Sequence, residues 1–240
     1  MNQTVISKQD VLASVIHDNY LTLVVLNRMN IKLGFGNQSV EDVAQQHGIN
    51  PDALVLILNL FNNEIYFLSI DKKYEYLPDT LLYLKNSHAF FLGGKIPLIQ
   101  NNIQQLVLML HDTNAKMIEY FYNKYIEEVT EHMDYENNTV FPYIETMHQA
   151  LLSNQNLDIL EKEFNIEIYG EHHDDIEDAL ADLKNILIRH LPEKNDGELR
   201  ITILQQLFEL EFDLYSHTRI ENEVLIPLTK SLEDKLQALL

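Results

Sequence analysis

The chain has 240 residues and no cysteine, and its 37 acidic and 17 basic side chains give a formal charge of −20 at pH 7. The missing thiols exclude disulfides, thiolate metal ligands and cysteine nucleophiles, and the negative charge argues against general binding to nucleic acids. With 46% hydrophobic residues but only 7 Gly and 6 Pro, the composition favours a folded, mainly helical globule. The polar N-terminus and the lack of a long apolar run predict a soluble cytoplasmic protein that does not bind membranes.

Residues 1–77 are expected to form a small helical domain, because apolar residues recur at helical spacing over 11–29 and 40–60. Ser39 is placed to cap a helix at 40–46, although Asp42 stands where a full capping box would carry Glu or Gln. Aromatic and β-branched residues around an Asp-Lys-Lys turn predict a β-hairpin at 64–76. The pattern therefore predicts a helix-turn-helix followed by a small β-wing.

Residues 78–240 predict four long amphipathic helices, at roughly 79–111, 113–147, 155–190 and 197–238. The connections between them are short, so that neighbouring helices should run antiparallel. The predicted fold class is mainly α, with an up-down four-helix bundle after the small N-terminal domain.

An internal repeat contains the candidate metal-binding residues. HMDYENNTVFP at 132–142 and HTRIENEVLIP at 217–227 share the pattern His-x-x-x-Glu-Asn-x-x-apolar-apolar-Pro and lie 85 residues apart. The i, i+4 spacing puts the imidazole and the carboxylate of each copy on one helical face, where both can reach one cation. The two prolines, Pro142 and Pro227, are expected to bend or end the ligand-bearing segments.

Two further histidines obey the same symmetry, since His88 precedes His132 by 44 residues and His173 precedes His217 by 44. Four imidazoles and two carboxylates then converge in the bundle, which is too many for one tetrahedral zinc ion and suits two metal ions that share bridging carboxylates. His172 remains an alternative to His173, and His111 is expected to be structural or to support a ligand. The predicted metal ligands are His88, His132, Glu136, His173, His217 and Glu221.

The paired motifs resemble the hemerythrin-type HHE cation-binding domain over about residues 79–230, and the whole chain is most similar to the di-iron proteins that repair iron centres. This resemblance implies two iron ions with an oxide or hydroxide bridge, with Glu136 and Glu221 as bridging ligands. It implies reaction with oxygen or nitric oxide and a role in repairing iron–sulfur clusters damaged by stress, with iron–sulfur proteins as partners. Where that family carries a Cys-Cys-Gly-Gly signature, this chain reads Leu33-Gly34-Phe35-Gly36.

Two other functions stay open. The bundle can act as a sensor of oxygen, nitric oxide or redox state that signals through the N-terminal domain, or as an interaction scaffold. Direct DNA binding is not expected, because residues 40–60 contain no Lys or Arg. No general acid or nucleophile is identified, so enzymatic turnover is not implied, and the oligomeric state, including a homodimer, is left open.

Overall fold

The computed structural model describes residues 5–63, 66, 74–110, 113–153, 165–171, 178–191 and 196–239. These residues are helical and contain no sheet; the one β-bridge joins Val11 to Ser39. Most of the predicted hairpin at 64–76 lies outside the described residues, and its last three, Tyr74–Tyr76, form a 3₁₀-helix. In the parts of the chain that are described, no helix is long and apolar enough to cross a membrane.

The N-terminal part contains four short helices: α1 (Leu12–Asp18), α2 (Thr22–Arg28), α3 (Val40–Gln46) and α4 (Pro51–Asn62). The apolar stretch 11–29 is split at Asn19, whose side-chain oxygen accepts a hydrogen bond from the amide of Leu21 and so competes with helix formation. The predicted helices at 40–46 and from Pro51 are confirmed.

The helix α3 begins with a full capping box, which the sequence analysis did not expect. The amide of Asp42 donates to the Ser39 hydroxyl, and the amide of Ser39 donates back to the Asp42 carboxylate. The expectation was wrong because the shorter Asp side chain spans the same gap as Glu at this position. The hydrogen bonds from Ser39 lower the pKa of Asp42.

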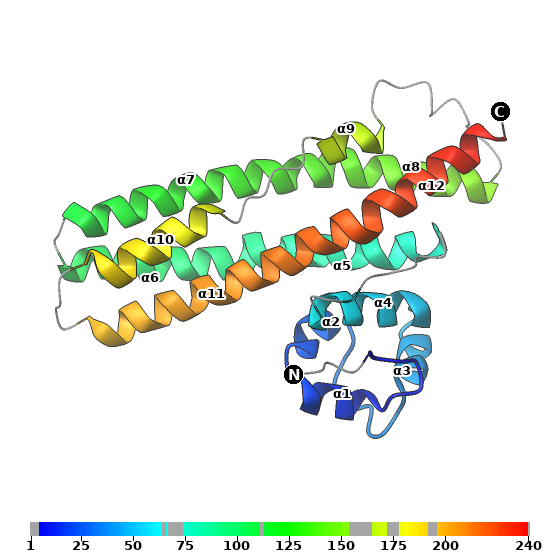
Figure 1. The fold of residues 1–240 in the computed structure, drawn as a ribbon, viewed down its shortest axis with the longest axis horizontal. Helices are drawn as coiled ribbons and strands as arrows, with labels where there is room; N and C mark the ends of the chain where they lie inside the picture. Colours follow the sequence, from blue (N-terminus) through cyan, green and yellow to red (C-terminus); the bar gives the residue numbers. More distant parts are fainter. Residues whose placement is uncertain are drawn as a thin grey trace. The chain divides into compact units, whose positions relative to one another are not determined.

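Three long helical stretches follow and pack together, each interrupted by a π-helical segment (Figure 1). The first comprises α5 (Leu77–Phe90), η2 (Phe91–Lys95) and α6 (Ile96–Leu110). The second comprises α7 (Thr113–Tyr135), η3 (Glu136–Val140) and α8 (Phe141–Ser153), and the third α11 (Gly197–Ile220), η5 (Glu221–Leu225) and α12 (Ile226–Gln237). The region predicted as a helix at 155–190 contributes α9 (Ile166–Glu171) and α10 (Asp178–Arg189); residues 155–164 and 172–177 lie outside the described residues.

The prolines explain the π-helical segments. Pro97, Pro142 and Pro227 each stand two residues after the end of such a segment. A proline inside an α-helix cannot donate to the carbonyl four residues earlier and collides with it, and a widened turn relieves this conflict. The helix continues beyond Pro142 and Pro227, so the prediction that they end it is wrong, and the predicted bends stay a prediction.

The chain forms two compact units, and the predicted domain boundary at residue 77 stays a prediction. One unit comprises Met1–Ser87, Thr139–His173 and Ser216–Leu240, and the other comprises His88–Asn138 and Asp174–Tyr215. In the second unit, α7 packs on α6 and α10. Its core is a continuous cluster of aliphatic and aromatic side chains that also includes Leu207, Leu210 and Leu214 of α11.

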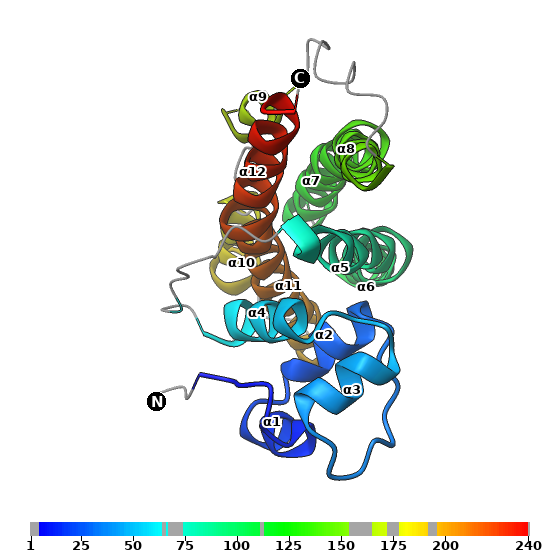
Figure 2. The same cartoon turned by 90° about the vertical axis from the view of Figure 1, so that its right-hand side faces the viewer.

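In the first unit, α12 packs on α8 and α9, and Figure 2 shows α9 alongside α12. Glu233 of α12 connects the three helices, since its Oε1 accepts hydrogen bonds from the hydroxyl of Tyr143 (2.8 Å) and from the amide of Ile166 (2.9 Å). Burial raises the pKa of Glu233 above its ordinary value despite these two donors. The folded state therefore favours the protonated carboxyl.

This raised pKa predicts a pH-dependent loss of stability. As the pH rises through the unfolded pKa of 4.5 and then the raised native pKa, ionisation of Glu233 favours the unfolded state. Glu233→Gln keeps an acceptor and cannot ionise, so its free energy of unfolding should exceed that of the wild type by a margin that grows between about pH 4 and pH 7. Urea denaturation across this range checks it, with the exposed Glu131→Gln on α7 as control. Parallel curves for Glu233→Gln and wild type would contradict the assignment.

Candidate metal centre

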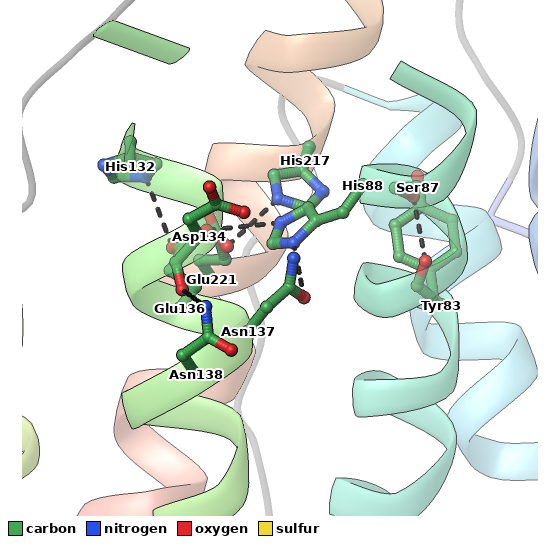
Figure 3. A network of polar contacts seen from close by, with 10 residues as sticks. All are labelled: Tyr83, Ser87, His88, His132, Asp134, Glu136, Asn137, Asn138, His217 and Glu221. Atoms are coloured by element: carbon green, nitrogen blue, oxygen red, sulfur yellow. Dashed lines mark hydrogen bonds and ion pairs between the residues drawn. The ribbon is translucent and has the colours of Figure 1, made fainter. Parts of the chain in front are cut away.

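Four of the predicted ligands come together as a buried cluster. His88, Glu136, His217 and Glu221 each offer a ligand atom, and these atoms all lie within 4.8 Å of one another. His88 belongs to α5, Glu136 is the first residue of η3, His217 lies in the last turn of α11 and Glu221 begins η5. Figure 3 shows the four side chains pointing toward one another.

Local sequence explains why these side chains converge. In the second copy of the repeat, the i, i+4 spacing brings the Nε2 of His217 within 3.0 Å of the Oε1 of Glu221. His88 comes from another helix, and its Nε2 lies 3.2 Å from the Oε2 of Glu136. Two ligand atoms at right angles around a metal ion, each about 2.1 Å from it, are about 3 Å apart. The observed separations therefore match the edges of a coordination shell.

The burial of the cluster makes its two carboxylate charges energetically unfavourable. Glu136 and Glu221 are 0% exposed, and His88 and His217 are 1% and 3% exposed. Two carboxylates of like charge, removed from water and held within 4.8 Å of each other, are costly unless positive charge compensates them. The imidazoles beside them supply that charge only when protonated, whereas a divalent cation supplies it at neutral pH.

The other two predicted ligands have different positions. His132 is partly exposed, at 18%, and lies outside the four-residue cluster, but its Nε2 is 3.3 Å from the Oε1 of Glu136. The two carboxylate oxygens of Glu136 therefore face two different imidazoles, those of His132 and His88. His173, its alternative His172, and His111 lie outside the described residues.

Sequence reasoning assigned no role to Asn137, although the repeated pattern contains an asparagine at this position in both copies. In the structure the Nδ1 of His88 lies within hydrogen-bond distance of the Oδ1 of Asn137, at 3.0 Å. The signal was present in the motif, but the partner of Asn137 lies 49 residues away in sequence, and only the packing of α5 against η3 reveals it.

The donor set limits the chemistry of the cluster. Imidazole nitrogen and carboxylate oxygen together suit iron, manganese and zinc. The buried His/Glu cluster could thus hold a metal ion, and the donor set alone does not choose among these metals.

Comparison with known proteins identifies no relative of this chain. No protein-family model matches the chain, and no curated protein matches it. The functional argument therefore rests on the helical fold and on the buried cluster of His88, Glu136, His217 and Glu221.

Proposed function

We propose that this protein is a non-haem di-iron protein of hemerythrin type, in which an up-down four-helix bundle holds two iron ions that react with oxygen or nitric oxide. The observation that carries the proposal is the group of two imidazoles and two fully buried carboxylates with ligand atoms within 4.8 Å of one another. The repeated His-x-x-x-Glu motif supports it, because packing alone gives no reason for the same buried acid in both copies.

The second metal ion is supported by the arrangement around Glu136. A carboxylate that bridges two metal ions offers one oxygen to each, and the two oxygens of Glu136 face His88 and His132 separately. In this proposal Glu136 and Glu221 bridge the two ions, and His88, His132, His173 and His217 complete the ligands.

The physiological role we propose is repair of iron–sulfur clusters damaged by oxidative or nitrosative stress, with iron–sulfur proteins as partners. Because the chain contains no cysteine, thiolates take no part in its binding of iron, and imidazole and carboxylate are the ligand types that the cluster offers. This role requires the centre to bind iron and to respond to the gases that cause the damage.

The test is an anaerobic titration with Fe²⁺, followed by absorption spectra after exposure to air and to nitric oxide. We expect saturation near two irons per chain and new charge-transfer absorption after either gas. The matched control is the double variant His217→Ala/Glu221→Ala, which should bind less iron and show weaker bands. Spectra that do not respond to either gas would contradict the di-iron proposal, and equal recovery of a damaged iron–sulfur enzyme with and without the protein would contradict the repair role.

A specific set of contacts favours a second candidate, a sensor that signals through the N-terminal helices. Asn86, two residues before His88, donates to the carbonyl of Arg28 at the end of α2 over 2.5 Å. Arg219, between His217 and Glu221, donates to the carbonyl of Leu60 in the last turn of α4 over 3.0 Å. Residues beside the ligands thus hold the C-terminal ends of two N-terminal helices.

Hydrogen exchange separates the two candidates. A sensor should change the exchange rates of the amides in α2 and α4 when Fe²⁺ is added and again when nitric oxide is added. If exchange in these helices is indifferent to both additions while the iron spectrum changes, the sensor candidate fails and repair remains.

A further inference from the structure

Both ring nitrogens of His88 have partners, and the partners are consecutive residues of η3. The Nε2 lies 3.2 Å from the Oε2 of Glu136, and the Nδ1 lies 3.0 Å from the Oδ1 of Asn137. Figure 3 shows the Asn137 side chain reaching the ring of His88. His88 is 1% exposed, so water does not compete freely for either nitrogen.

The π-helical segment accounts for this pairing. A π-turn holds more residues than an α-turn, so successive side chains diverge less around the helix axis. Glu136 and Asn137 are the first two residues of η3 and can therefore reach the same imidazole. The neighbouring Asn138 does not share this role: it is exposed, and its amide donates to the carbonyl of Asp134 in its own helix.

The chemistry of the amide oxygen sets the tautomer. An amide oxygen only accepts hydrogen bonds, so the proton of the neutral ring belongs on Nδ1, and Nε2 keeps its lone pair. That lone pair is the one that faces the ligand atoms of Glu136, His217 and Glu221. A leucine at position 137 has a similar volume but would accept nothing, and the ring would be free to turn or to change tautomer.

We propose that Asn137 is a positioning residue that holds His88 in the Nδ1–H tautomer with Nε2 directed at the metal. This inference rests on the metal-binding function proposed above. Partners of this kind fix the ring orientation of ligating histidines, and their loss weakens metal binding about 10- to 100-fold. Asn137 acts through His88 and does not itself reach the metal.

The experiment compares Zn²⁺ affinity, measured by competition with a chromogenic chelator, in the wild type and three variants. Asn137→Leu should bind Zn²⁺ about 10- to 100-fold more weakly. Asn137→Asp keeps an acceptor and should restore the affinity. Asn138→Leu, the same substitution one residue along and on the exposed side, should bind as the wild type does.

A spectroscopic measurement gives a readout that a merely structural role would not move. In the metal-free protein, ¹⁵N NMR of the imidazole nitrogens should show His88 protonated on Nδ1 in the wild type and in Asn137→Asp, because a metal bound to Nε2 would itself leave the proton on Nδ1. This measurement decides the matter even if Asn137→Leu does not fold.

The outcomes separate two kinds of failure. If the wild type does not bind Zn²⁺, the proposed metal function fails. If the wild type binds Zn²⁺ but Asn137→Leu binds it as tightly as Asn138→Leu does, or if His88 is protonated on Nε2, the role of Asn137 is overturned and the metal function stands.

Discussion

Replacing both buried carboxylates by amides should stabilise the metal-free protein and abolish its stabilisation by metal. Glu136 and Glu221 are 0% exposed and belong to one cluster with ligand atoms within 4.8 Å of one another, so their charges repel each other in a region of low dielectric. Glutamine has almost the same shape and no charge. The amide oxygen of glutamine can still accept a hydrogen bond from an imidazole beside it.

The expected size of this effect is large. In metal-free buffer near pH 7.5, Glu136→Gln/Glu221→Gln should be more stable than the wild type by about 1–4 kcal/mol, the range found when buried ion pairs are replaced by apolar residues of similar volume. Adding Fe²⁺ anaerobically at about 1,000 times its dissociation constant should stabilise the wild type by about 4 kcal/mol and the variant by almost nothing. Without metal the double variant should unfold at the higher denaturant concentration, and with Fe²⁺ the wild type should.

Chemical denaturation with and without Fe²⁺ measures both halves of this prediction. The matched control is Glu131→Gln/Glu198→Gln, which removes two exposed acids from α7 and α11 and makes the same change in net charge. This control should respond to metal as the wild type does. A metal-free double variant that is less stable than the wild type and still gains stability with Fe²⁺ would show that the carboxylates serve packing instead.

Loss of the Arg219 guanidinium should destabilise the protein by about 3 kcal/mol. Arg219 is 7% exposed, and its Nη1 donates to the carbonyls of Leu60 (3.0 Å) and Asn63 (2.6 Å), while its Nη2 donates to the carbonyl of Tyr66 (2.8 Å). These carbonyls lie in the last turn of α4 and just beyond it, where no helical amide can reach them. Glu223 receives the Nε–H over 2.6 Å.

Arg219→Met keeps most of the side-chain volume and removes every one of these donors, so that three carbonyls and one carboxylate lose a partner together. Urea denaturation gives the free energy of unfolding, with Arg189→Met on the exposed face of α10 as the control. The control should stay within about 0.5 kcal/mol of the wild type. If the free energy of unfolding of Arg219→Met also stayed within about 0.5 kcal/mol of the wild type, the hydrogen bonds between α11 and the end of α4 would not contribute to stability.

Much of the helical architecture could be predicted from the sequence, because apolar periodicity and capping residues are local signals. The helices at 40–46 and from Pro51, and the long stretches near 79–111, 113–147 and 197–238, follow from them. The π-helical segments could not be predicted in this way. The sequence analysis considered Pro142 and Pro227 but not Pro97, and a proline can end, bend or widen a helix, so that only the packing on both sides of it decides which.

In the candidate site, too, local contacts could be predicted from the sequence and contacts between distant residues could not. The i, i+4 pair of His217 and Glu221 is local, and the internal repeat made it stand out. The approach of His88 to Glu136 is a contact across 48 positions of sequence, which the repeat symmetry suggested and no local signal could establish. The hydrogen bond from His88 to Asn137 was missed altogether, since an asparagine in a helix has many roles that sequence alone does not separate.

The central claim is that the buried cluster of His88, Glu136, His217 and Glu221 holds metal. The most direct test is elemental analysis of protein purified without oxygen or chelators, side by side with His88→Ala/His217→Ala prepared in the same way. We predict about two metal ions per chain in the wild type, in keeping with two bridging carboxylates, and a large loss in the double variant. Metal-free wild-type protein, or equal metal content in the two preparations, would contradict the account.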